Sequence, residues 1–161
     1  MVEPAAHRTS SAWRLALDRR TFAAVGEREL LHLLEMPTLL AAPMGPHYCR
    51  QALIWNDRLL PALDLAAWLH HAPEPEPWLL AGIVAGLPHP GGEPEFAALR
   101  LAAIPTRQSV TDALACALPM QPAGWRSLAW ACFRCDGQPA PILDLAHILS
   151  GGLLAAQPSG C

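Results

Sequence analysis

Two cysteines three positions apart, Cys132 and Cys135, form a C-x-x-C pattern. This spacing is typical of zinc sites and of redox pairs. A structural zinc site needs two more ligands at matching spacing, but the sequence offers only His147 further along and no second C-x-x-C. Residues three apart on a strand also face opposite sides of a sheet. We therefore predict buried strand thiols, and keep a thiol- or zinc-binding protein that uses Cys132 and Cys135 as an alternative.

Two carboxylates in matching surroundings, Asp64 and Asp144, could suggest paired general acids and bases. Each follows a short apolar run and precedes a helical pattern, where a side-chain oxygen can accept the free N–H groups of a first helical turn. We therefore interpret both as helix caps.

The sequence lacks residues that several classes of enzyme require. All 11 basic residues are arginine, so a P-loop lysine, a Schiff-base lysine and a Ser-Lys dyad are excluded. The sequence also lacks G-x-S-x-G, H-E-x-x-H and a glycine-rich phosphate loop. We expect no enzymatic activity and no cofactor.

The two aspartates belong to two copies of one stretch, residues 57–69 and residues 137–149. Aligning the copies places Pro61 on Pro141, and each copy has the pattern of a short apolar strand followed by a helical turn. Asn-Asp stands at the start of the first copy and Asp-Gly at the start of the second. Both dipeptides can adopt the positive φ that a two-residue hairpin turn requires.

A second pair of matching segments lies upstream, at residues 22–28 and 101–107, with almost the same shift. Two matched blocks in the same order predict two similar halves, joined by a proline-rich linker. The expected boundaries are a flexible tail at 1–11, halves at about 12–71 and 78–150, a linker at 72–77 and a second flexible tail at 151–161.

Short apolar or alternating runs between turn residues predict a mainly β chain built as two small barrels. The expected strands are residues 13–17, 21–25, 29–34, 52–55, 58–63, 78–87, 96–104, 109–114, 127–135 and 139–143. Helices are expected at 65–70 and before residue 149, the latter ended by Gly151-Gly152, with a single helical turn at 47–51.

Length and charge restrict the class of protein further. A chain of 161 residues suits one domain or two closely packed small ones. The net charge of −3 and the lack of a basic cluster argue against nucleic-acid binding. The longest apolar run, residues 78–87, is much shorter than the roughly 20 residues of a membrane-spanning helix, so we expect no membrane insertion. We expect a cytoplasmic protein whose five cysteines are reduced.

Several of these segments resemble one known family. Residues 52–65 resemble the G-x-x-N-x-R-G-x-x-x-P-x-x-D-L signature of CheW-like domains, and residues 28–34 resemble its R-E-V-x-E-I-L segment. Residues 46–48 resemble the Pro-x-aromatic turn ahead of the signature, and residues 136–145 resemble the D-G-x-x-x-x-I-L-D-x ending. The resemblance covers roughly residues 13–150 and depends on the order and spacing of the motifs.

The resemblance implies a fold of two interleaved five-stranded SH3-like β-barrel subdomains with short helices. It also implies a non-enzymatic adaptor that couples the cytoplasmic tips of chemoreceptors to the regulatory domain of a CheA-type histidine kinase. Some relatives serve type IV pilus and twitching-motility systems, and others form rings with kinase regulatory domains. Other CheW-like proteins are further candidate partners. The alternative within the family is a structural or regulatory module without receptor coupling.

The chain departs from the family pattern at positions that the resemblance assigns to partners. Asn56 and Asp57 stand where the family has Arg-Gly, and His32 stands where it has Glu. Losing an arginine removes up to five donors and a charge, so we expect either a divergent partner or the loss of array coupling. The expected partner-binding residues are Leu30, His32, Asn56, Asp57 and Arg58, and the expected structural residues are Pro61, Asp64, Pro141 and Asp144.

Overall fold

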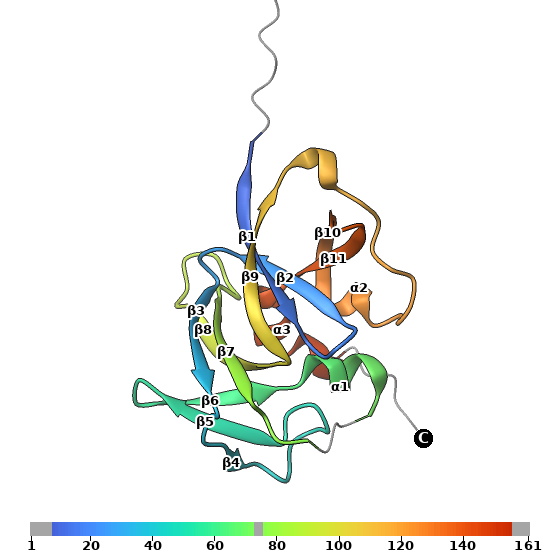
Figure 1. The fold of residues 1–161 in the computed structure, drawn as a ribbon. Helices are drawn as coiled ribbons and strands as arrows, with labels where there is room; N and C mark the ends of the chain where they lie inside the picture. Colours follow the sequence, from blue (N-terminus) through green and yellow to red (C-terminus); the bar gives the residue numbers. More distant parts are fainter. Residues whose placement is uncertain (1–7, 73–75, 156–161) are drawn as a thin grey trace, which may run out of the picture.

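Two β-sheets and several short helices make up residues 8–72 and 76–155, the part of the chain that the computed structural model describes (Figure 1). The five-stranded sheet has the order β10-β11-β2-β1-β9, and the six-stranded sheet has the order β3-β7-β8-β6-β5-β4. The strands are β1 (Ser10–Ala16), β2 (Phe22–Gly26), β3 (Leu30–Glu35), β4 (Leu40–Ala41), β5 (Gln51–Trp55), β6 (Arg58–Leu63), β7 (Leu80–Gly86), β8 (Glu95–Leu101), β9 (Ala103–Val110), β10 (Ala129–Cys135) and β11 (Gln138–Leu143). The helices are α1 (Leu65–His70), α2 (Trp125–Leu128), α3 (Leu145–Leu149), α4 (Gly152–Ala155) and the 3-10 helix η1 (Asp112–Leu114).

The mainly β fold with short helices is therefore confirmed, with one strand more than predicted in the second sheet. That strand, β4, has only two residues and pairs with the start of β5. The expected tails and linker fall partly on residues 1–7, 73–75 and 156–161, which lie outside the described residues.

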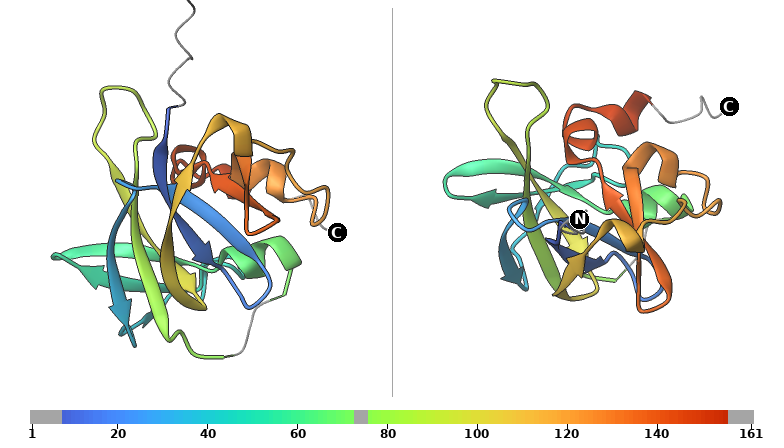
Figure 2. Two further views of the ribbon diagram at one scale, coloured as in Figure 1. Left: turned by 45° about the horizontal axis from the view of Figure 1, so that its top comes forward. Right: turned by 90° about the horizontal axis from the view of Figure 1, so that it is seen from above.

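Each sheet contains strands from both halves of the sequence. The hairpin of β1 and β2 and the hairpin of β7 and β8 are equivalent antiparallel pairs. β9, from the second half, pairs with β1, and β3, from the first half, pairs with β7. β11 then joins β2 in parallel, and β6 joins β8 in parallel. This exchange interleaves the two sheets, as Figure 1 and the two views of Figure 2 show.

The five-stranded sheet curls toward a barrel. Ala115, in the segment that follows β9, forms an antiparallel bridge with Phe133 of β10. The backbone N–H of Cys116 donates to the carbonyl of Cys132 at 3.0 Å. The connection from β9 therefore reaches the free edge of β10 and covers part of it.

The repeated stretches adopt the same local structure. Asn56 and Asp57 have φ of 48° and 60°, and Asp136 and Gly137 have φ of 52° and 76°, so both hairpins turn through two residues of positive φ. Both strands then lead into a helix that an aspartate caps. The backbone N–H of that aspartate donates to Tyr48 in the first half and to Leu128 in the second, at 2.8 and 2.7 Å.

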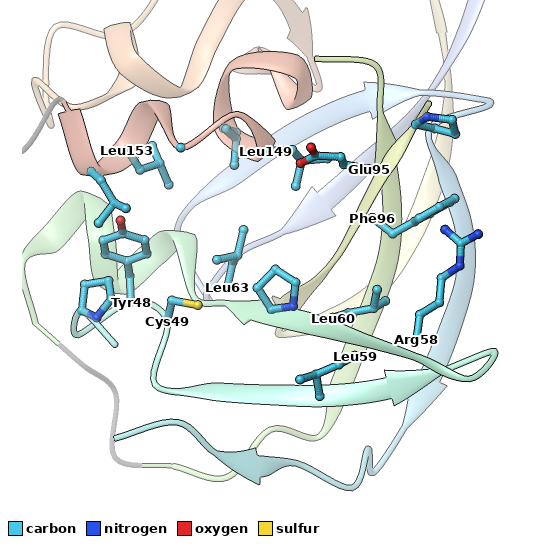
Figure 3. A pocket seen from close by; sticks show the side chains of 16 residues that line it. Tyr48, Cys49, Arg58, Leu59, Leu60, Leu63, Glu95, Phe96, Leu149 and Leu153 are labelled. Atoms are coloured by element: carbon cyan, nitrogen blue, oxygen red, sulfur yellow. The ribbon is translucent and has the colours of Figure 1, made fainter. Parts of the chain in front are cut away.

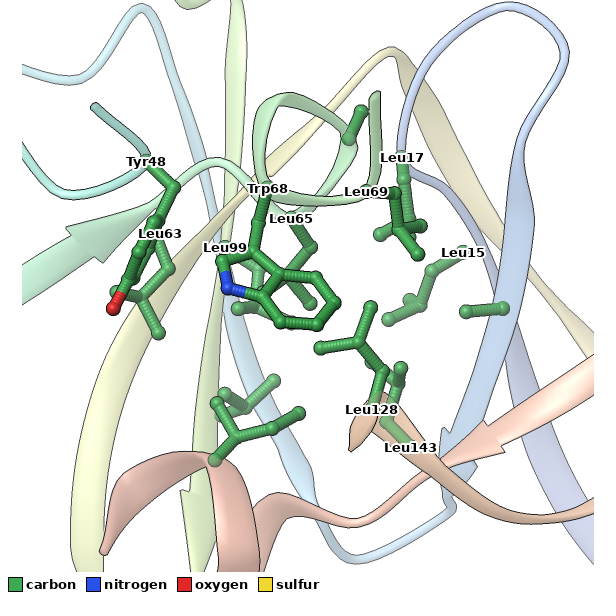
Figure 4. Packing of buried hydrophobic residues seen from close by; sticks show 14 of the residues in the cluster. Leu15, Leu17, Tyr48, Leu63, Leu65, Trp68, Leu69, Leu99, Leu128 and Leu143 are labelled. Atoms are coloured by element: carbon green, nitrogen blue, oxygen red, sulfur yellow. The ribbon is translucent and has the colours of Figure 1, made fainter. Parts of the chain in front are cut away.

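The main hydrophobic core joins the two sheets and the helices. Leu15 of β1, Leu99 of β8 and Leu143 of β11 are at most 1% exposed. Trp68 of α1 and Leu128 of α2 pack into the same cluster, and Figure 4 shows Trp68 among these leucines. Because each buried leucine contributes about 1.5–3 kcal/mol, this shared core stabilises the two sheets as one unit.

Four local expectations were wrong. The helical turn at 47–51 is a β-turn in which the N–H of Cys49 donates to the carbonyl of Pro46 at 2.8 Å. The strand expected at 96–104 is two strands, because the chain bends at Ala102, whose N–H donates to Ala16 at 2.8 Å. The strand expected at 109–114 ends at Val110 and is followed by η1, and α2 precedes a shorter strand than the one expected at 127–135.

The second tail is also shorter than expected. Gly151 has φ of +86° and ends the region of α3, but Gly152–Ala155 form α4. Leu153 is only 2% exposed and belongs to the main core. The two glycines at 151 and 152 suggested a tail, but burial of Leu153 holds this segment against the core.

The upstream part of the sequence duplication was aligned wrongly. Ala24 of β2 pairs with Ile142, and Ala98 of β8 pairs with Ala62, the residue that corresponds to Ile142 in the first half. β2 is therefore equivalent to β8. The expected match placed residues 22–28 on 101–107, which span the bend between β8 and β9. Both regions are rich in alanine, so their composition allowed a false match.

Candidate functional site

The tip of the β5–β6 hairpin extends from the six-stranded sheet (Figure 1). Asn56 and Asp57 form the exposed turn, and Arg58 follows at the start of β6. The Arg58 guanidinium lies over the ring of Phe96, 5.0 Å from its centroid, and Trp55 contacts the same ring at 5.9 Å between centroids. These contacts connect the end of the hairpin next to the turn to Phe96 of β8.

One face of this hairpin is apolar and exposed. Ile54 and Leu59 are direct cross-strand partners, and their residues are 63% and 68% exposed. Their neighbours Leu53 and Leu60 point the other way and are buried, as the alternation of a strand requires. An exposed pair of large aliphatic side chains on a projecting hairpin is the kind of surface that a protein partner covers.

A groove of about 500 Å³ lies beside the hairpin, between β6, the start of β8 and helices α3 and α4 (Figure 3). Arg58, Leu59 and Pro61 line it on the hairpin side. Its other walls are mostly apolar and include Tyr48, Leu63, Phe96, Leu149 and Leu153. The groove thus lies between the second sheet and the C-terminal helices of the other half.

Burial affects the titratable groups on the wall of this groove. Burial raises the pKa of Tyr48 above its ordinary value, and the neighbouring Cys49 adds to this effect. Burial also raises the pKa of Cys49. Both groups are therefore neutral at neutral pH, and this wall presents an uncharged surface.

Leu30 and His32 lie apart from the hairpin tip. Both are on β3, where Leu30 pairs with Val84 of β7 and His32 pairs with Ile83 across a β-bulge. Two strands, β7 and β8, separate β3 from β6 in the sheet. His32 is exposed and Leu30 is half-buried. The structure therefore places the expected partner-binding residues in two groups of one sheet.

The structural residues of the repeat lie at the ends of equivalent strands. Asp64 Oδ1 accepts a hydrogen bond from the Ala67 N–H at 3.0 Å, and Asp144 Oδ1 accepts one from the His147 N–H at 3.1 Å. Pro61 of β6 pairs with Ala52 of β5, and Pro141 of β11 pairs with Cys132 of β10. Both aspartates therefore hold the backbone at the start of a helix, as the capping interpretation predicted.

The two cysteines of the C-x-x-C pattern are both buried in β10, at 5% exposure each. Cys132 lies next to Cys116, with 3.3 Å between the sulfur atoms, and Cys135 lies 4.0 Å from the carboxylate of Asp136. Within residues 8–72 and 76–155, no group of three or more His, Cys, Asp or Glu residues could hold a metal ion.

Sequence reasoning missed most of the groove. Leu59 had a usable signal, because successive residues of the predicted strand 58–63 face opposite sides, so Leu59 and Leu60 cannot both face the core. Phe96, Leu149 and Leu153 come together only through the parallel pairing of β6 with β8 and the packing of α3 and α4. No local pattern in the sequence indicates that these residues share a groove.

Comparison with known proteins identifies the fold. No family model matches the sequence, and no curated protein matches it. Among solved structures, the chain is similar to the crystal structure of the scaffolding protein TtCheW from Thermoanaerobacter tengcongensis. The match has a TM-score of 0.65 at 8% identity and covers 92% of this chain and 93% of that one. The fold is therefore CheW-like, as the motifs indicated. Among the described residues, no helix is long and apolar enough to cross a membrane.

Proposed function

We propose that this chain is a non-enzymatic adaptor of a chemosensory system. In this proposal it works in the cytoplasm and couples the cytoplasmic tip of a chemoreceptor to the regulatory domain of a CheA-type histidine kinase. The observation that carries the proposal is the CheW-like fold over nearly the whole chain, since the matched protein is itself a scaffolding protein. The exposed hairpin and the apolar groove beside it supply surfaces that such a role requires.

The groove suits a helical partner. Its walls are mainly apolar, and a groove of this kind accepts the apolar face of an amphipathic helix. We therefore assign the receptor tip to the groove, bound there as an amphipathic helix, with Leu59 and Arg58 on the rim. We assign the kinase regulatory domain to β3, where Leu30 and His32 lie, and we assign the hairpin tip with Asn56 and Asp57 to the receptor side. Further CheW-like proteins are candidate neighbours for the β3 surface.

The experiment compares two substitutions at equally exposed aliphatic residues. Leu59→Arg places a charge on the rim of the groove, and Ile104→Arg places one on β9 of the other sheet, where the residue is 67% exposed. Both should change the free energy of unfolding by no more than about 0.5 kcal/mol, because both side chains are already in water. Leu59→Arg should weaken binding of the receptor tip at least tenfold, and Ile104→Arg should leave it unchanged.

The departures at His32, Asn56 and Asp57 favour a second candidate, a structural or regulatory module without receptor coupling. The two functions differ in one result. A module of this kind binds the kinase domain or another CheW-like protein but gives no saturable binding of a receptor tip. Whether the system controls swimming or type IV pili follows from the receptor and kinase genes that neighbour this one.

A further inference from the structure

The thiols of Cys116 and Cys132 face each other at the β10 edge of the five-stranded sheet. Cys116 Sγ lies 3.3 Å from Cys132 Sγ. Ala115 pairs with Phe133 in an antiparallel bridge, so Cys116 is directly opposite Cys132. Directly opposed residues of an antiparallel pair have Cα atoms about 4.5–5.5 Å apart and side chains on the same face. This separation lies inside the range of about 4.4–6.8 Å that a disulfide bond spans.

The surroundings differ for the two sulfur atoms. Cys132 is buried at 5% exposure, whereas Cys116 is half-buried on the connection between β9 and α2. Burial raises the pKa of Cys132 to about 12, and the hydrogen bond and charge of Cys116 add to this. Cys132 is therefore a protonated thiol at neutral pH, and Cys116 is the thiol that a reagent in solution can reach first.

We propose that Cys116 and Cys132 form an intramolecular disulfide when the protein meets hydrogen peroxide, and that this bond fastens the segment after β9 to β10. The proposal is independent of the proposed adaptor function. It concerns Cys116 and Cys132 and leaves out Cys135, which faces the opposite side of β10.

The reaction balances in two steps. The Cys116 thiolate attacks one peroxide oxygen, the O–O bond breaks, and the departing hydroxide takes a proton to become water. Cys116 is now a sulfenic acid. The Cys132 sulfur attacks the Cys116 sulfur, the S–O bond breaks, and the departing hydroxide takes the Cys132 proton to become a second water. Two thiols are oxidised by two electrons, and one peroxide is reduced to two waters.

The disulfide would reinforce the junction between the segment after β9 and β10. The bridge of Ala115 with Phe133 and the hydrogen bond from Cys116 N–H to Cys132 are the backbone contacts shown there. A covalent link at this point closes the chain from Cys116 to Cys132, a loop that includes α2. Restricting this loop in the unfolded chain should raise the melting temperature by roughly 6–12 °C.

The test uses the full chain with Cys161→Ser as background, treated with hydrogen peroxide. Peptide mapping by mass spectrometry without reductant should give a Cys116–Cys132 linked peptide and a loss of two hydrogens from the intact mass. The melting temperature should rise and return to its starting value after dithiothreitol. Cys135→Ser, which removes an equally buried thiol of the same strand, should behave in the same way as the background protein, and Cys116→Ser should show neither change.

Mapping of the background protein decides the matter even if a cysteine variant fails to fold. Further oxidation of Cys116 to sulfinic acid while Cys132 remains a free thiol would overturn the proposal. A linkage of either residue to Cys49 or Cys135, or a disulfide between two molecules in place of the internal one, would also overturn it.

Discussion

The carboxylate of Asp64 joins the first turn of α1 to the side chain of Arg100. Oδ1 accepts the N–H of Ala67 at 3.0 Å, and Oδ2 accepts a hydrogen bond from Arg100 Nη1 at 2.9 Å. Both side chains of this ion pair are only 11% exposed. The equivalent aspartate, Asp144, caps α3 in the same way but has no arginine in the matching contact within the described residues. The sequence repeat is therefore asymmetric in charge.

This asymmetry predicts unequal costs for two equivalent substitutions. Asp144→Ala removes a cap and should cost about 0.5–2 kcal/mol of stability. Asp64→Ala also removes the carboxylate from a nearly buried guanidinium and should cost about 3–5 kcal/mol. Urea unfolding of both variants measures the difference. Asp64→Asn keeps an oxygen that can cap the helix and should fall between the two, whereas equal costs for the two alanine variants would show that the ion pair contributes nothing.

Glu29 should make the free energy of unfolding depend on pH. Burial raises the pKa of Glu29 above its ordinary value, the N–H of Gly26 opposes this by donating to Oε1 at 2.7 Å, and the charge of Asp144 adds to the rise. A carboxyl group whose pKa is raised by folding stabilises the protein in its protonated form. That contribution is complete below the pKa of the unfolded chain, about 4.3, and is lost as the pH rises through the pKa of the folded protein.

Glu29→Gln removes this loss, because the amide resembles the protonated acid and its oxygen can still accept from Gly26. We expect the stability of Glu29→Gln relative to the natural protein to increase between about pH 4 and pH 7. Unfolding by urea across this range measures the difference. Glu93→Gln, at an exposed loop position, serves as the control. A difference for Glu29→Gln that is constant across the range would rule out the assigned effect of burial.

The hairpin tip offers a test of recognition. The triple variant His32→Glu, Asn56→Arg and Asp57→Gly introduces the residues that the resemblance to CheW-like domains assigns to these positions. Glycine suits position 57, where φ is 60°. Arginine at position 56 would have to adopt the φ of 48° that Asn56 has, which should cost about 1 kcal/mol of stability. We expect the variant to bind kinase domains and receptor tips of standard chemotaxis systems more tightly than the natural chain does, because charge-assisted contacts are restored.

Affinity for those standard partners and for the partners encoded beside this gene is measured for both proteins. Melting temperatures show whether the triple variant remains folded at the assay temperature. If the natural chain already binds the standard partners as tightly as the triple variant, these three positions do not determine the choice of partner.

The sequence predicted features that depend on a few neighbouring residues. The hairpin turns at Asn56 and Asp136 and the caps of α1 and α3 follow from residue types at fixed local spacing. Features that depend on distant pairing were missed. The equivalence of β2 with β8 becomes visible only through their parallel partners, β11 and β6, since alanine-rich strands carry little information about register.

The residues of the candidate site also differ in how far local sequence predicted them. Arg58 and Pro61 belong to a sequence motif, and both line the groove. Leu153 looked like part of a tail because two glycines precede it, yet it is buried in the main core. Its burial depends on contacts with residues far away in the chain, and single-segment patterns cannot show such contacts.

If this chain is an adaptor, it should bind two signalling proteins. The most direct measurement is titration calorimetry of the purified full chain against the regulatory domain of the CheA-type kinase and against the receptor tip encoded nearest to its gene. Each partner is first shown to bind a standard CheW-like protein. We predict saturable binding of both partners, with the receptor tip weakened at least tenfold by Leu59→Arg. Absence of binding to both partners, when each binds the standard protein, would contradict the proposed function.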